Sequence, residues 1–241
     1  MALLELQGLT RHFGGLRAVG DLSFAVEAGE ILGLIGPNGA GKTTVFNLVT
    51  GFVRPSSGRI LLAGRPIAGL RPHAVARRGV ARTFQIVKPF PGLTVKENVT
   101  LAAFLRHRRR ADAEAAALEV LQRLGLSHRA GDLASQLTLM DQKRLEMAKA
   151  LATGPRLLLL DEPMGGLNPA EVDAASAIVR KIRDAGVTVV LVEHVMKAIM
   201  RISDRVVVMN QGEKIAEGPP ARVVEEPAVL AAYFGKRAAP C

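Results

Sequence analysis

Cysteine is almost absent from this sequence of 241 residues, since Cys241 at its end is the only one. A single thiol excludes a disulfide framework and a cysteine-based metal site within the chain. A hydrophobic content of 49% is ample for a buried core, so we expect a folded protein and not a disordered one. The length suits one large domain or two small ones.

Long apolar runs are missing too. The longest, such as VTVVLV at Val187–Val192, are far shorter than the ~18 residues of a membrane-spanning helix and suit buried strands. The opening residues, MALLELQGLT, have neither the basic segment nor the long apolar segment of a secretory signal. We therefore expect a cytoplasmic protein.

Acidic residues are scarce relative to basic ones, 22 against 32, which gives a net charge of +10. Such a charge suits nucleic acid, an anionic membrane face or a phosphorylated ligand. The densest basic run, Arg106–Arg110, has no interleaved aromatic residues and precedes an alanine-rich helical stretch. We interpret it as a solvated helix face and expect no nucleic-acid partner.

The pattern of apolar residues predicts strands first, then helices, then strands and helices in alternation. Three- and four-residue spacing predicts helices within about Pro89–Gly154, at Val95–Leu105, Asp112–Leu124 and Thr138–Leu151. The later part predicts, in order, a strand at Arg156–Leu160, a helix at Pro169–Ala185, a strand at Val187–Val192, a helix at Met196–Ile202, a hairpin turning at Asn210–Gly212 and a short helical tail at Ala221–Phe234.

Three runs, ILGLIG, RLLLLD and VTVVLVEH, are continuously apolar and then end in polar residues or glycine. Continuous apolarity is typical of strands buried on both faces of a parallel sheet, which indicates an α/β fold. Ligands of such sheets bind at the carboxyl ends of the strands. The residues that follow the three runs should therefore meet at one edge.

The segment Gly36–Thr43, GPNGAGKT, follows the first of these strands and precedes a helical run. Its spacing fits G-x-x-x-x-G-K-[ST], in which backbone N–H groups cradle phosphates. Lys42 would neutralise the β- and γ-phosphates and the Thr43 hydroxyl would ligate Mg²⁺. The segment predicts that the chain binds a nucleoside triphosphate.

Two acids, Asp161 and Glu162, follow the second apolar run, and His194 follows the third. Asp161 is placed to hold Mg²⁺, and Glu162 could take the proton from an attacking water as general base. His194 can hydrogen-bond the γ-phosphate at the same edge. Gln85 has no support from pattern alone, and a surface glutamine is its default interpretation.

The stretch LTLMD, Leu137–Asp141, contains Thr138-x-x-Asp141, which fits a capping box and predicts a helix start. A helix N-terminus is also a ready anion site. These residues alone do not choose between the two interpretations.

Taken together, these residues resemble the ATP-binding cassette (ABC) family over essentially the whole chain. GPNGAGKTT matches the family's Walker A motif, LLLLDEP its Walker B motif and GGLN its D-loop. The resemblance places Glu162 at the catalytic glutamate, Gln85 at the Q-loop and His194 at the switch histidine. It implies an ATPase with ATP and Mg²⁺ as cofactors, catalytic residues Glu162, His194 and Gln85, and metal ligands Thr43, Gln85 and Asp161. The ATP-binding residues that it implies are Phe13, which would stack on adenine, and Ala18, Gly36, Pro37, Asn38, Gly39, Ala40, Gly41, Lys42, Thr43 and Thr44.

LTLMD falls at the family's signature, usually Leu-Ser-Gly-Gly-Gln, which contacts the ATP bound to the opposite subunit. Thr138 keeps a hydroxyl, whereas Leu139 and Met140 replace both glycines and Asp141 replaces the glutamine. The resemblance implies that Thr138 and the backbone of Met140 bind the nucleotide in trans. Because that contact comes from the backbone, we expect Met140→Gly to be mild or even activating.

The resemblance implies a P-loop NTPase fold of the α/β class, with a mainly parallel core sheet, an antiparallel β subdomain and an α-helical subdomain. We expect one nucleotide-binding domain over 1–241, with a catalytic core at about 1–86 and 155–220, a helical subdomain at about 87–154 and a C-terminal tail at about 221–241.

Longer stretches, such as ARTFQIVKPFPGLTVKENV, look like ATPases of branched-chain amino-acid importers. That subgroup implies a homodimer or a heterodimer with a paralogous ATPase, two transmembrane permease subunits, and indirectly a solute-binding protein, at the inner face of the cell membrane. The alternatives are a lipopolysaccharide-export ATPase and a soluble non-transport ABC protein. A P-loop GTPase would need Asn-Lys-x-Asp, which the sequence lacks.

Overall fold

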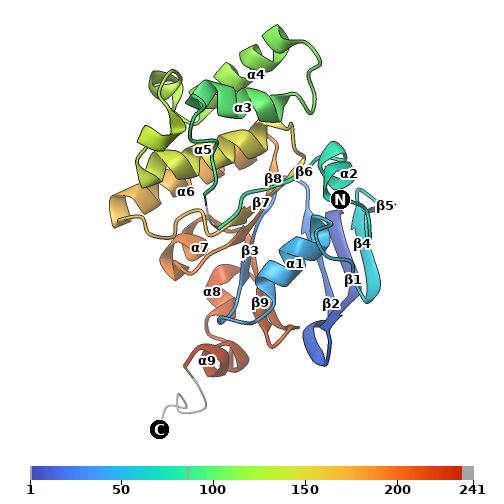
Figure 1. The fold of residues 1–241 in the computed structure, drawn as a ribbon. Coiled ribbons are helices and arrows are strands. Elements are labelled where there is room, and N and C mark those ends of the chain that lie inside the picture. Colours follow the sequence, from blue (N-terminus) through green and yellow to red (C-terminus); the bar gives the residue numbers. More distant parts are fainter. Residues whose placement is uncertain (1, 86, 235–241) are drawn as a thin grey trace.

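The computed structural model describes residues 2–85 and 87–234 (Figure 1). Residues 1, 86 and 235–241 lie outside the described residues; they include Cys241 and the end of the predicted C-terminal tail.

A six-stranded sheet forms the centre of the molecule, in the order β10–β9–β3–β8–β7–β6. All of its neighbours pair in parallel except β10, which pairs antiparallel with β9. Its strands are β3 (Ile31–Ile35), β6 (Val80–Arg82), β7 (Leu157–Asp161), β8 (Thr188–Val192), β9 (Arg205–Asn210) and β10 (Glu213–Gly218). Strands β3, β7 and β8 are buried along their whole length, which confirms the parallel sheet expected from their continuous apolarity.

A second, antiparallel sheet has the order β2–β1–β4–β5. Its strands are β1 (Ala2–Phe13), β2 (Leu16–Glu27), β4 (Ser57–Leu62) and β5 (Arg65–Pro66). Alternate residues of β1 and β2 are buried, and they share a core with helix α1 and one face of the central sheet. The fold is therefore of the predicted α/β class.

Helices cover the other face of the central sheet and form a separate group above it in Figure 1. The helices are α1 (Lys42–Val49), α2 (Pro72–Arg77), α3 (Val95–Ala103), α4 (Arg110–Arg123), α5 (Leu139–Ala152), α6 (Pro169–Asp184), α7 (Met196–Ile202), α8 (Pro220–Val223) and α9 (Pro227–Phe234), with 3₁₀ turns η1 (Ser127–Arg129) and η2 (Ala134–Gln136). Helices α3, α4 and α5 pack on one another through small and branched apolar residues. The subdomain boundaries stay a prediction.

The predicted elements lie within a few residues of the observed ones, with one correction. The single helical tail predicted over Ala221–Phe234 is two helices, α8 and α9. Pro227 starts α9 because proline lacks a backbone N–H and cannot continue a preceding helix. Within the described ranges, no helix combines the length and apolarity needed to cross a bilayer.

Candidate functional site

The loop between β3 and α1 runs so close to neighbouring backbone that two of its glycines leave no room for a side chain. A Cβ on Gly36 would lie 2.1 Å from the carbonyl oxygen of Met209, and one on Gly41 would lie 2.5 Å from that of Ala18. Both glycines have positive φ, 151° and 100°. The loop is therefore fixed against β9 and β2, and Ala18 lies beside it.

The loop leads into the N-terminus of α1, which no side chain caps and whose first turn carries no acidic residue. Asn38 and Gly39 are exposed at the tip of the loop, and Ala40 is buried beneath it. Thr43 is exposed and Thr44 is half-buried in the first helical turn. The free N–H groups and the helix dipole of such a terminus favour an anion.

Lys42 points back into the loop. Its Nζ donates to the carbonyl oxygens of Gly36, at 2.7 Å, and Pro37, at 3.0 Å, and the residue is only 6% exposed. Burial lowers the pKa of Lys42, while the negative charges of Glu162 and Asp161 oppose that shift. The ammonium group thus lies among the loop carbonyls and near Glu162, the predicted general base, and Asp161, a predicted metal ligand.

Asp161 ends β7 and is almost fully buried. Its Oδ2 accepts a 2.6 Å bond from Arg82 Nη2, and Arg82 Nη1 donates to Asn47 Oδ1 in α1, also at 2.6 Å. This buried bridge joins β6, β7 and α1. Sequence reasoning missed Arg82 and Asn47 because Arg82 lies 79 positions from Asp161 and 35 from Asn47, and no local pattern links them.

The carboxylate of Glu162 contacts the other two predicted catalytic residues, His194 and Gln85. Its Oε1 lies 2.5 Å from His194 Nε2, and its Oε2 accepts a 2.8 Å bond from Gln85 Nε2. Its φ is +51°, a left-handed conformation that costs a non-glycine residue of order 1–3 kcal/mol. Glu162, His194 and Gln85 therefore meet at one place; the positions after buried strands indicated this for Glu162 and His194, whereas only the family resemblance pointed to Gln85.

Helix α5 begins with the predicted cap at Thr138, whose Oγ1 accepts a 3.2 Å bond from the Asp141 N–H. The capping box is only half formed, because the Asp141 carboxylate accepts from the Thr138 hydroxyl and pairs with Arg144. At the start of α3, by contrast, Glu97 reaches the backbone N–H of Thr94 and completes the box. Aspartate is one methylene shorter, which explains the difference.

The burial of Met140 corrects the expectation that Met140→Gly is mild. Its side chain is 6% exposed and belongs to the hydrophobic core, while Leu139 is exposed beside Gly166. The expectation that Met140→Gly is mild ignored this packing, because the comparison with the usual signature concerned only the backbone. Removing the side chain leaves a cavity.

Phe13 ends β1 at the tip of the β1–β2 hairpin, with its ring exposed. The Arg11 guanidinium lies 4.5 Å from the ring centroid. An exposed ring is available for stacking on a base, and one of its faces already carries a cation.

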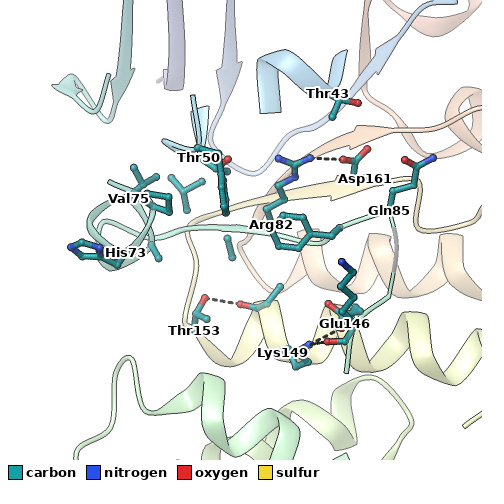
Figure 2. A pocket seen from close by; sticks show the side chains of 18 residues that line it. Thr43, Thr50, His73, Val75, Arg82, Gln85, Glu146, Lys149, Thr153 and Asp161 are labelled. Carbon is teal, nitrogen blue, oxygen red and sulfur yellow. Dashed lines mark hydrogen bonds and ion pairs between the residues drawn. The ribbon is translucent and has the colours of Figure 1, made fainter. Parts of the chain in front are cut away.

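A cavity of about 800 Å³ adjoins this site (Figure 2). Thr43, Asp161 and Gln85 line one end of it. Glu146 and Lys149 of α5 and Thr153, which follows that helix, line the other end, and Arg82 lies between the two ends. The exposed rings of Phe52 and Phe84 also line it and meet edge to face, with centroids 5.8 Å apart. The cavity therefore connects the predicted metal ligands with the surface of the helical group.

A parallel sheet, a phosphate loop with closely packed glycines after β3 and a carboxylate pair at the end of β7 define the class of P-loop nucleoside triphosphatases. Within that class the chain belongs to the ABC transporter family, whose description matches residues 19–165. A second description, branched-chain amino acid ATP-binding cassette transporter, matches residues 213–239. The chain is therefore a nucleotide-binding ABC ATPase, and the resemblance seen in the sequence is confirmed.

Curated relatives match over nearly their whole length. The high-affinity branched-chain amino acid transport ATP-binding protein BraF of Pseudomonas aeruginosa is 44% identical, and the match covers 97% of this chain and 98% of BraF. LivG of Escherichia coli, described in the same words, is 43% identical with the same coverage. The lipopolysaccharide export system ATP-binding protein LptB of Escherichia coli is 34% identical, with 98% of each chain covered.

Solved structures show the same fold. An ATP-binding cassette of an ABC transporter in its ADP conformation superposes with a TM-score of 0.90 at 28% identity, covering 98% of this chain and 100% of that one. A bacterial ABC transporter cassette solved as a dimer gives a TM-score of 0.81 at 26% identity, covering 90% of this chain and 98% of that one.

Proposed function

We propose that this chain is the ATP-hydrolysing subunit of an importer for branched-chain amino acids or a related small solute. Identities of 43% and 44% to two branched-chain amino acid transport proteins, against 34% to LptB, support this reading over lipopolysaccharide export. The observation that carries the catalytic part is the contact of Glu162 with both His194 and Gln85 beside the phosphate loop.

In this mechanism the loop Gly36–Thr43, Thr44 and the N-terminus of α1 bind the phosphates, with Lys42 as their counter-charge. Phe13 stacks on the adenine and Ala18 lines the loop. These two roles depend on the positions of β1, which carries Phe13, and of β2, which carries Ala18.

The residues Thr43, Asp161 and Gln85 fit a Mg²⁺ ion, because they offer oxygen donors around one cavity. No group of three or more His, Cys, Asp or Glu side chains that could hold a metal occurs among residues 2–85 and 87–234, so the phosphate oxygens would complete the ligand set. Held by these residues, Mg²⁺ would supply positive charge that offsets the negative charge of the phosphates.

Glu162 takes the proton of the attacking water as general base. His194 orients this carboxylate and the γ-phosphate. Gln85 contacts the same carboxylate and lines the cavity where Mg²⁺ would bind.

The same proposal extends to the assembly. Two copies, or this chain and a paralogue, close face to face around ATP, so that Thr138 and the backbone of Met140 contact the nucleotide of the opposite subunit. The pair docks on two permease subunits at the inner face of the membrane, served by a solute-binding protein. The cavity beside Gln85 fits a permease segment, because it is lined by exposed Phe52 and Phe84 and reaches the metal ligands.

The experiment is to tag the chain in its own cells, solubilise the membranes gently and identify the proteins that purify with it. We expect two permease proteins, and a second ATPase if the dimer is heteromeric. Recovery of the chain from the soluble fraction with ribosomes or DNA, and without any permease, would contradict the proposal.

A further inference from the structure

Glu193, the residue before His194, is a buried carboxylate that joins two loops of the site. It is 3% exposed. Its Oε1 accepts a 2.5 Å bond from the N–H of Met164, in the loop that follows Glu162. Its Oε2 accepts from the N–H of His194 at 3.1 Å and from that of Val195 at 3.5 Å. One side chain therefore holds the backbone of the Glu162 loop and of the His194 loop together.

Lys143 approaches the same loops from helix α5. It is 8% exposed, and its Nζ donates a 2.8 Å bond to the carbonyl oxygen of Glu162. Burial lowers the pKa of Lys143, and the charges of Glu193 and then Glu162 oppose this shift. Burial raises the pKa of Glu193, and its three backbone donors and the Lys143 charge oppose that shift. Each buried charge thus offsets part of the cost of burying the other.

Both groups contact backbone next to the reacting side chains and leave the phosphate loop untouched. The N–H of Glu162 donates to Val192 at 2.9 Å, so Lys143 fixes the opposite side of a residue whose φ is +51°. Such a conformation persists only where its surroundings hold it. His194 needs the same support, because its ring is half exposed and, among residues 2–85 and 87–234, its side chain hydrogen-bonds to Glu162 only.

We infer that Glu193 and Lys143 are positioning residues for ATP hydrolysis, which hold Glu162 and His194 in register. This inference rests on the roles proposed above for those two residues. Lys143 lies on α5, the helix that begins at Thr138, so displacement of that helix by a second subunit reaches the Glu162 carbonyl through one hydrogen bond. The pair thereby links the signature of one subunit to its own catalytic carboxylate.

The test is steady-state kinetics with Mg²⁺-ATP on the purified protein, with ATP affinity measured separately by calorimetry. Glu193→Gln keeps the shape but turns one acceptor into an amide that faces N–H groups, and Lys143→Met removes the donor to Glu162. Since a misplacement of about 1 Å costs up to 10²-fold in rate, we expect kcat to fall about ten- to a hundredfold in each. ATP affinity and KM should stay unchanged, and Lys143→Arg should recover most of the rate.

Two controls separate positioning from loss of stability and from failure of the proposed site. Glu30→Gln breaks a partly buried carboxylate pair, with Arg205, outside the site; it should lower stability and leave kcat unchanged. Glu162→Gln reports on the site itself. If Glu162→Gln is inactive while Glu193→Gln and Lys143→Met keep the parent kcat, this inference is overturned and the proposed function stands. Equal losses of ATP affinity and kcat would also overturn it, whereas full activity of Glu162→Gln would overturn the proposed roles first.

Discussion

Among single residues, Glu162 is the one on which both the geometry of the site and its proposed chemistry depend. Its carboxylate meets His194 and Gln85, its carbonyl meets Lys143, and its backbone is left-handed. A side chain with that many partners has one geometry, which is what a general base requires.

The variant Glu162→Gln removes the base and keeps the size of the side chain. We expect turnover to fall by about 10²–10⁴-fold, because general acid–base catalysis contributes that much. ATP binding should be retained, because Lys42 and the loop glycines are unchanged. Hydrolysis assays and calorimetry on the same preparation measure both quantities, and turnover near the parent rate would remove Glu162 from the role of base.

The N-terminal part of helix α5 contains three residues with different roles. Thr138 caps it, Met140 packs into the core and Lys143 reaches Glu162. A change in the signature therefore affects folding as well as any contact with a second nucleotide.

Two variants separate these effects. Thr138→Ala should cost about 0.5–2 kcal/mol of unfolding free energy through the lost cap. Met140→Ala should cost about 2–5 kcal/mol through the cavity it leaves. Denaturant unfolding checks both values.

Thr138→Ala should also leave ATP binding by dilute monomer unchanged and slow hydrolysis in the assembled transporter, because its hydroxyl is proposed to face the opposite subunit's nucleotide. If the folded variant loses monomer binding as much as turnover, the hydroxyl acts within its own subunit and the trans assignment is wrong.

Local patterns were enough to predict most elements and the phosphate loop, because continuous apolar runs and glycine spacing reflect nearby residues. The meeting of Glu162 with His194 followed from one topological rule about strand ends. The Arg82–Asp161 bridge and the Glu193 bonds could not be predicted, since each joins segments far apart in sequence through side-chain geometry alone. The burial of Met140 was missed because its signature position, and not its helical face, guided the interpretation.

At the scale of the whole molecule, the cavity between α2, β6 and α5 is where a permease segment is proposed to bind. Phe52 lines it and is 56% exposed, and Leu118 on α4 is 46% exposed outside it. We expect Phe52→Ser to reduce permease-stimulated hydrolysis and leave the basal rate of the isolated chain unchanged, with Leu118→Ser as matched control. Equal stimulation of the parent and Phe52→Ser would exclude this cavity as the docking site.

If this chain works as proposed, its ATP hydrolysis drives import of a small solute. The most direct measurement is uptake of labelled leucine, isoleucine and valine by cells that lack the chain, complemented with the parent or with Glu162→Gln. We expect the parent to restore uptake of at least one of them and Glu162→Gln, expressed at the same level, not to restore it. Uptake that is unaffected by deletion, or restored equally by both, would contradict the proposed function.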